Sequence, residues 1–254
     1  KAVFPMYFVV RVNKKPAAFG MWKKQPDLHN AQAQWDTYQG KYKLYPGYGR
    51  DMAGNDIGYY MTYDLAKGEQ VEVQVGVSFV SIEGARANLN AEQQGFNFDK
   101  TVADTRAEWA NTLNRISVEG GTDDQRRILY TALYHSQIHP TVLQDVDGKY
   151  PKMESNENGH TNGNRYTIYS LWDTYRAAHP FYTIVMPDRV DGMVSSLVEQ
   201  AEVQGFLPIW GLWGKENYCM VGNHAVSIVA EAYHKGFRGF DAERAFQAVK
   251  KTQT

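Results

Sequence analysis

The sequence has little cysteine, no long apolar run and no excess of charge of one sign. A single cysteine among 254 residues excludes an internal disulfide. Its apolar stretches fall short of the about 18 residues that a membrane-spanning helix needs, so no span is expected. Lysine and arginine number 27 against 28 acidic residues, for a formal net charge of -1. Because no basic stripe exists to release counterions from a phosphate backbone, no nucleic-acid partner is expected.

Aromatic residues are plentiful by contrast. Tryptophan, tyrosine and phenylalanine make up 13% of the chain, and hydrophobic residues make up 43%. Such a chain can bury the core of one large domain or of two ordinary ones. Flat aromatic faces with polar tips suit sugar rings, but a protein core needs them as well.

The first third of the chain has the pattern of β-strands. The segment 71–81, VEVQVGVSFVS, alternates apolar and polar residues, as a strand with one buried face does. Its apolar face would hold Val71, Val73, Val75, Val77 and Phe79. The segments 6–12 and 57–65 are similar, and turn-rich stretches separate them. About five strands are expected before residue 82, which favours part of an antiparallel sandwich.

After Ser81 the apolar spacing becomes helical. Thr122 and Gln125 have the spacing of a capping box, Pro187 begins a helix that Gly205 ends, and another helix begins at Asp241. Two more helices are expected in 170–185 and 224–236. Between the helices lies a polar stretch of residues 141–168, whose length is typical of a functional or mobile loop.

The stretch LPIWGLWGKENYCMVGNH, residues 207–224, gathers most of the candidate chemistry. Glu216 follows Trp210 and Trp213 closely, and a carboxyl group surrounded by indole rings is desolvated, which favours its protonated form. A protonated carboxyl group is what a general acid needs. Spacing alone favours an exposed loop glutamate over this interpretation. Cys219 has no neighbouring base that would make it a nucleophile.

A second candidate lies in LWDTYRAAHP. Asp173 could pair with Arg176 on one helical face or cap the helix, which are purely structural roles. Alternatively, Asp173 could bind sugar hydroxyls while the ring of Trp172 stacks under the sugar. His135 and His139 have the i, i+4 spacing of zinc ligands but no evident third ligand, so structural roles are favoured.

Residues 169–236 closely resemble glycoside hydrolase family 92, the calcium-dependent exo-acting α-mannosidases. The resemblance extends back through the motifs YTALYHSQIHP, DVDGKY, VEGGTDDQ and VGVSFVSIEGARANL, in the family's order. It implies an exported enzyme, periplasmic, cell-surface or secreted. Its substrate would be a mannose-containing oligosaccharide, with α-1,2-linked mannose of N-glycans or mannans cleaved with inversion.

The resemblance also implies the fold and the cofactor. The fold would be a β-sandwich followed by an all-α barrel of helical hairpins, an α/α six-hairpin toroid that is incomplete here. We expect part of the sandwich in residues 1–84, a helical linker in 85–118 and the first part of the barrel in 119–254. The family's calcium ion contacts the vicinal hydroxyls of the sugar, and its ligands in this chain are unknown.

Site residues follow from the same resemblance. The acid of the family's WxLxGxExxCM stretch falls on Glu216, and the SLWDT motif places Trp172 and Asp173 in the mannose pocket, with Trp210 beside it. Family members often carry glutamate and asparagine where this chain has Gly211 and Lys215. An acid at position 216 argues against the branch that accepts mannosyl phosphates.

The family's catalytic base belongs to a paired-aspartate motif that nothing after Lys250 resembles. The expectation is therefore an internal piece of a longer enzyme, which needs the remaining polypeptide and is inactive alone. Two other functions stay open: a carbohydrate-binding protein without chemistry, and an α/α-barrel enzyme acting on another glycan.

Overall fold

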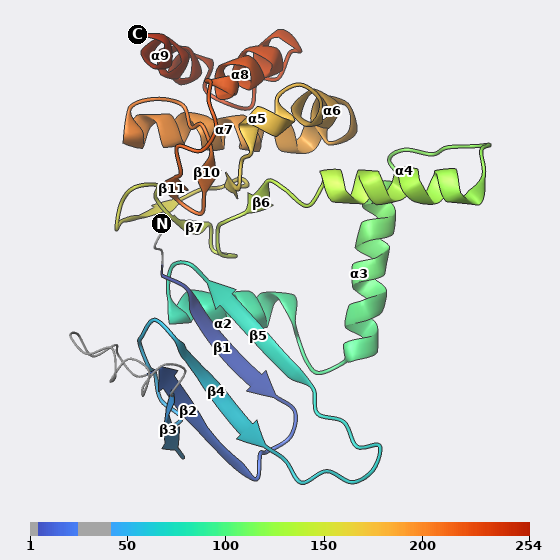
Figure 1. Ribbon diagram of the computed structural model, residues 1–254, viewed down its shortest axis with the longest axis vertical. Coiled ribbons are helices and arrows are strands. Elements are labelled where there is room, and N and C mark those ends of the chain that lie inside the picture. Colours follow the sequence, from blue (N-terminus) through green and yellow to red (C-terminus); the bar gives the residue numbers. More distant parts are fainter. Residues whose placement is uncertain (1–4, 25–41) are drawn as a thin grey trace, which may run out of the picture. The chain divides into compact units, whose positions relative to one another are not determined.

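The computed structural model describes residues 5–24 and 42–254 (Figure 1). Its contacts divide the chain into two compact units, Arg11–Val73 and Lys1–Val10 with Gln74–Thr254. Across both described ranges, no helix combines the length and the apolar character that crossing a membrane requires.

The smaller unit contains a three-stranded antiparallel sheet in the order β3-β2-β4. Its strands are β2 (Ala18–Lys24), β3 (Tyr42–Pro46) and β4 (Ile57–Thr62). Trp22 on the central strand lies opposite Leu44 on one side and Gly58 on the other. A Cβ at Gly58 would stand 2.5 Å from the Trp22 ring. Position 58 therefore requires glycine, because the indole covers the backbone there.

Two further strands, β1 (Tyr7–Val12) and β5 (Val73–Ser78), pair in a separate sheet. The valines expected to form the buried face of β5 are instead exposed: Val73 and Val75 by 55% and Val77 by 42%. The alternation was predicted correctly, but the choice of buried face was wrong.

The opposite face of β5 is the one that packs, against helix α2 (Ile82–Glu92). A Cβ at Gly76 would lie 2.3 Å from the Ala85 carbonyl oxygen and 2.7 Å from Leu89 Cβ. The helix thus approaches the strand most closely where the strand has no side chain.

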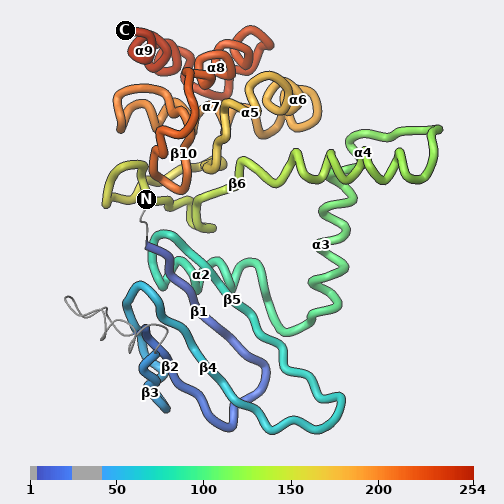
Figure 2. Tube along the Cα trace, viewed as in Figure 1, coloured from blue at the N-terminus to red at the C-terminus, as the bar shows by residue number. Residues whose placement is uncertain are grey.

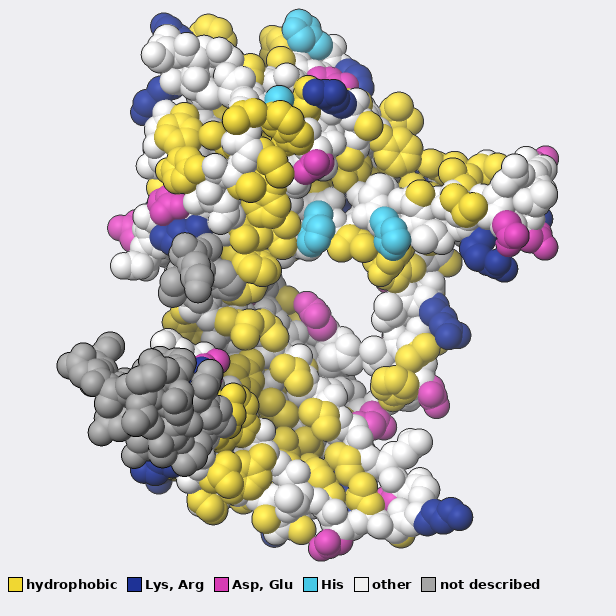
Figure 3. Space-filling view, viewed as in Figure 1, with side chains coloured by type: hydrophobic (Ala, Val, Ile, Leu, Met, Phe, Trp, Pro, Cys, Tyr) yellow, Lys and Arg dark blue, Asp and Glu magenta, His cyan; other side chains and the backbone are white. Residues whose placement is uncertain are grey.

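The larger unit is mainly helical. Its other helices are α3 (Phe98–Leu113), α4 (Asp123–Ser136), α5 (Leu171–Thr174), α6 (Ala178–Val185), α7 (Pro187–Gln204), α8 (His224–His234) and α9 (Ala242–Gln253). Helix α4 exposes several apolar side chains, which are yellow in Figure 3; among them are Ile128, Leu129 and Tyr134.

The predicted helix ends are confirmed where a capping residue marks them. Thr122 and Gln125 form both hydrogen bonds of a capping box, at 3.2 and 2.9 Å. Helix α7 begins at Pro187 and ends before Gly205, whose φ of 98° is left-handed. The Asp241 carboxylate accepts from the Arg244 amide and caps α9.

The helix expected in 170–185 is instead two helices, α5 and α6, with a break at 175–177. Pro180 lies in the first turn of α6, where a missing N–H costs no hydrogen bond. In a continuous helix the same proline would lie in the interior and remove the bond to the Arg176 carbonyl.

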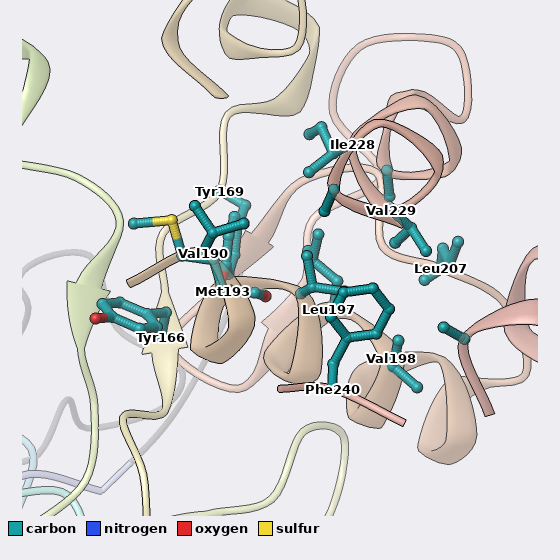
Figure 4. Close-up of a cluster of buried hydrophobic side chains, with 14 of the residues drawn as sticks. Tyr166, Tyr169, Val190, Met193, Leu197, Val198, Leu207, Ile228, Val229 and Phe240 are labelled. Atoms are coloured by element: carbon teal, nitrogen blue, oxygen red, sulfur yellow. Dashed lines mark hydrogen bonds between the residues drawn. The ribbon is translucent and has the colours of Figure 1, made fainter. Parts of the chain in front are cut away.

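The core of the larger unit surrounds α7, as Figure 4 shows. The face predicted from 3.6-residue spacing is buried, namely Val190, Met193, Val194, Leu197 and Ala201. Ile228 and Val229 of α8 and Phe240 pack against it. Helix α7 is therefore the element on which α6, α8 and α9 are assembled.

The polar stretch before α5 forms short hairpins, which Figure 2 traces between α4 and α5. Its strands are β6 (Thr141–Val142), β7 (Lys149–Pro151), β8 (Asn158–His160) and β9 (Tyr166–Thr167), which pair as β6-β9 and β7-β8. The order of strands first and helices later agrees with the predicted class. The sandwich, the six-hairpin barrel and the domain bounds 1–84, 85–118 and 119–254 stay predictions.

Candidate active site

Glu216 lies on a small hairpin formed by β10 (Gly211–Leu212) and β11 (Lys215–Glu216). The two turn residues, Trp213 and Gly214, have φ of 46° and 83°. Two consecutive left-handed residues give the tight turn whose twist matches paired strands. A tryptophan is unusual in that conformation, which marks the turn as a place that the surroundings hold fixed.

The loop before α5 holds this hairpin. The Trp213 amide donates to Thr167 Oγ1 at 2.7 Å, and the Tyr169 amide donates to the Gly211 carbonyl at 3.0 Å. The Phe79 ring lies 6.5 Å from the Trp213 ring, centroid to centroid. The hairpin is thus attached to the segment that precedes it by about 45 residues.

The Glu216 side chain is buried, with only 7% of the residue exposed. Its Oε1 accepts from the amides of Trp210 and Tyr218, both at 2.9 Å, and its Oε2 accepts from the Ile209 amide at 2.8 Å. Three backbone donors converge on one carboxyl group and fix its orientation.

The predicted apolar environment of Glu216 is therefore wrong in its chemistry. Spacing alone favours an exposed loop glutamate, and the structure shows a buried one instead. Backbone amides contact the carboxyl oxygen atoms, and such donors stabilise negative charge. Two of these amides belong to Ile209 and Trp210, in the apolar segment just before the hairpin. The third belongs to Tyr218, whose φ is 51°. No residue spacing reveals such a convergence of backbone groups.

Trp210 and Asp173 are brought together through Ser170. The Trp210 indole Nε1 donates to Ser170 Oγ at 2.8 Å, and that hydroxyl donates in turn to Asp173 Oδ2. An indole N–H can only donate, so the hydroxyl hydrogen is left for the aspartate. Within the described residues only Oδ2 of Asp173 has a side-chain partner, which leaves Oδ1 as an acceptor at the exposed end of this chain of hydrogen bonds.

Neither structural role considered for Asp173 forms as predicted. Among the described residues Asp173 makes no ion pair with Arg176, which donates to the Tyr175 hydroxyl at 2.6 Å instead. Ser170, not Asp173, is the residue before α5. Ser170 is a site residue that sequence reasoning missed, although its place before Trp172 and Asp173 offered a signal.

Trp172, the remaining predicted residue, lies beside His224. The Trp172 ring is 40% exposed and meets the His224 ring edge-on, at 5.6 Å and 77°. His224 stacks on Tyr175 at 4.0 Å and 11°. His224 Nε2 is buried and has no hydrogen-bond partner among the described residues. The exposed indole stands edge-on to this stacked pair, and its own face can stack on a sugar ring.

Gly211 stands where members of the family that the sequence resembles often carry glutamate. A Cβ at Gly211 would lie 2.8 Å from Gln200 Oε1, an oxygen that is itself buried without a partner among the described residues. The Gln200 side chain thus occupies space that a larger residue at 211 would need.

A polar cavity of about 830 Å³ lies elsewhere in the larger unit. Gln144, His160, Asp188 and Asp191 are among the residues that line it, and none of the four predicted site residues does. The Arg115 guanidinium donates to the carboxylate of Asp188 and lowers its pKa. This cavity is separate from the hairpin that carries Glu216.

The described residues do not supply a side-chain cage for a metal. Within residues 5–24 and 42–254, no group of three or more His, Cys, Asp or Glu side chains could hold an ion. The calcium ion that the resemblance implies stays a prediction, and no chemical step is assigned to it here.

Comparison with known proteins identifies the family. A family profile described as the glycosyl hydrolase family 92 catalytic domain matches residues 84–254. A family 92 α-mannosidase from Bacteroides thetaiotaomicron superimposes with a TM-score of 0.79 and 30% identity, over 97% of this chain and 32% of the other. A family 92 inverting mannosidase from Bacteroides thetaiotaomicron VPI-5482 superimposes with a TM-score of 0.81 and 28% identity, over 96% of this chain and 31% of the other.

A sequence relative points the same way. An uncharacterized secreted glycosidase from Arthroderma benhamiae is 27% identical over 187 residues, which cover 72% of this chain and 20% of that protein. This chain thus spans about a third of the solved structures and a fifth of the secreted relative. With the matched profile covering most of its length, the chain belongs to glycoside hydrolase family 92.

Proposed function

We propose that the complete polypeptide containing this chain is an exported exo-α-mannosidase. It removes terminal α-linked mannose, α-1,2-linked above all, from N-glycans or mannans. The observation that carries the proposal is the burial of the Glu216 carboxyl group inside the residues that match the family's catalytic domain. Similar proteins named α-mannosidase, inverting mannosidase and secreted glycosidase support it.

Inversion needs an acid on one side of the glycosidic bond and a base that activates water on the other. Glu216 is the proposed acid. Oε1 already accepts two amide hydrogens and Oε2 only one, so Oε2 has room for the proton that passes to the leaving oxygen. The three amides then stabilise the carboxylate that forms when the proton leaves.

The sugar itself would bind beside this acid. The exposed Trp172 ring offers a stacking surface, and Asp173 Oδ1 offers an acceptor for sugar hydroxyls. Trp210 keeps the aspartate oriented through Ser170. We place the base, the calcium ligands and part of the pocket in the remaining polypeptide, which makes this chain alone inactive in our proposal.

A disaccharide panel tests this function. The complete polypeptide is incubated with α-1,2-, α-1,3- and α-1,6-mannobiose and an α-glucobiose, with calcium or with a chelator. We expect mannose release, fastest from the α-1,2 linkage and lost with the chelator, and β-mannose as the first product by NMR. Binding of mannobiose without hydrolysis would favour a carbohydrate-binding protein, and release of glucose alone would favour a different glycosidase.

A further inference from the structure

In the loop between β7 and β8, Glu154 forms hydrogen bonds to the hairpin that carries Glu216. The Glu154 amide donates to the Gly214 carbonyl at 2.8 Å. Its Oε1 accepts from the Glu216 amide at 2.8 Å, and its Oε2 lies 3.3 Å from Lys215 Nζ. Glu154 therefore contacts three consecutive residues, the last of which is the proposed acid.

The backbone of Glu154 is held in an unusual conformation to make these contacts. Its φ of 51° lies in the left-handed region, which a residue with a Cβ adopts only when its surroundings impose it. The turn of the hairpin lies against the same loop: a Cβ at Gly214 would stand 3.7 Å from the Pro151 carbonyl oxygen and 3.9 Å from Met153 Cα. Loop and hairpin thus fit together closely.

Of the two side-chain contacts of Glu154, the hydrogen bond from the Glu216 amide is the one that acts on the proposed acid. The ion pair with Lys215 is about one-third exposed on each side, and such pairs contribute little to stability. The hydrogen bond from the Glu216 amide to Glu154 is short and charge-assisted, and it acts on the backbone of the proposed acid itself. Glu216 is thereby fixed at its backbone by Glu154 and at its carboxyl group by the three amides.

We propose that Glu154 is a positioning residue for Glu216. It holds the main chain of β11 so that the carboxyl group points at the glycosidic oxygen, and Lys215 offsets the charge that Glu154 brings close to the acid. This inference rests on the proposed mannosidase function. A displacement of a reacting group by about 1 Å can lower a rate by about 100-fold, so the loss of such a contact is measurable.

Three substitutions at Glu154 separate positioning from a general structural role. Glu154→Ala removes the acceptor, Glu154→Asp withdraws it while keeping the charge, and Glu154→Gln keeps an acceptor without the charge. Glu157→Ala is the matched control, because Glu157 belongs to the same loop but pairs with Lys152 at 3.1 Å. The complete enzyme is assayed on α-mannobiose and on a dinitrophenyl α-mannoside, whose leaving group needs no proton.

We expect Glu154→Ala and Glu154→Asp to lower kcat on mannobiose by about 10- to 100-fold with little change in KM. Loss on the activated mannoside should be smaller, about threefold or less, because a misplaced acid matters little there. Glu154→Gln and Glu157→Ala should stay close to the parent enzyme. Should Glu154→Ala fail to fold, the contrast between the Asp and Gln variants decides.

Equal losses on both substrates, or the same loss in Glu157→Ala, would overturn the positioning role. Glu216→Gln is measured alongside. If Glu216→Gln is inactive on mannobiose while Glu154→Ala and Glu154→Asp are unimpaired, only this inference fails. If Glu216→Gln is fully active on mannobiose, the proposed acid itself is wrong.

Discussion

At the scale of single residues, the site depends on where hydrogen-bond donors point. Ser170 accepts from the Trp210 indole and must therefore donate to Asp173, which fixes that carboxylate as an acceptor. The ring of His179, which belongs to the LWDTYRAAHP stretch, lies apart from this network. It is buried, stacks on Tyr169 at 6.2 Å and 18°, and meets Tyr182 edge-on at 5.3 Å. Burial lowers its pKa to about 4.

His179 should make stability fall in mild acid. The unfolded chain binds a proton there near pH 6.5, but the folded protein does so only near pH 4. The contribution of neutral His179 to the free energy of unfolding is thus complete above pH 6.5. It is lost as the pH falls from 6.5 to 4, by about 3 kcal/mol at most. Chemical denaturation at several pH values measures it.

A histidine substitution isolates this effect from other acid-sensitive groups. His179→Phe should flatten the pH dependence between 6.5 and 4, whereas His234→Gln, at an exposed position of α8, should leave it unchanged. Glu231 lines the same small cavity as His179 and pairs with Lys235 at 2.6 Å. An unchanged slope in His179→Phe would show that the buried ring does not cause it.

At the scale of elements, one buried carboxylate joins β5 and α2 to the loop before β7. Asp145 Oδ2 accepts from the Ser78 hydroxyl at 2.7 Å, and Oδ1 accepts from the Asn88 amide at 2.8 Å. Gly84 faces this carboxylate, because a Cβ there would stand 2.2 Å from Asp145 Oδ2. Two motifs that carried the family resemblance, VGVSFVSIEGARANL and DVDGKY, thus meet in a structural contact.

Gly84→Ala should therefore destabilise the protein. In an ordinary helix this change gains up to about 1 kcal/mol from helix propensity. Here the methyl group would displace Asp145 from a buried hydrogen bond with Ser78 and a partly buried one with Asn88, and loss of the buried one alone costs about 1 to 3 kcal/mol. We expect a net loss in the free energy of unfolding by urea. Gly163→Ala, where a Cβ meets nothing within 4 Å, is the control, and a stabilised Gly84→Ala would contradict the account.

At the scale of the whole molecule, the sequence predicted the elements better than their surroundings. The spacing on α7 and its marked ends predicted both the helix and its buried face. The spacing on β5 identified residues that share a face but not which face packs, because that depends on α2 approaching at Gly76. The spacing of apolar residues shows which side chains share one face of a helix or strand. Which face becomes buried depends on contacts with segments that are distant in the sequence.

The site follows the same rule. Motif resemblance selected Glu216, Trp172, Asp173 and Trp210, and the structure joins Trp210 to Asp173 through Ser170. Sequence reasoning could not predict the amides that hold Glu216, because their direction depends on backbone conformation. Nor could it predict Glu154, which lies 62 residues earlier in the chain.

The acid role of Glu216 is the central claim, and leaving-group dependence tests it most directly. Glu216→Gln in the complete enzyme keeps the shape of the side chain but cannot donate the catalytic proton. We predict a loss of about 1,000-fold in kcat/KM on α-1,2-mannobiose and a much smaller loss on a dinitrophenyl α-mannoside. Unchanged turnover of mannobiose by Glu216→Gln would contradict the account.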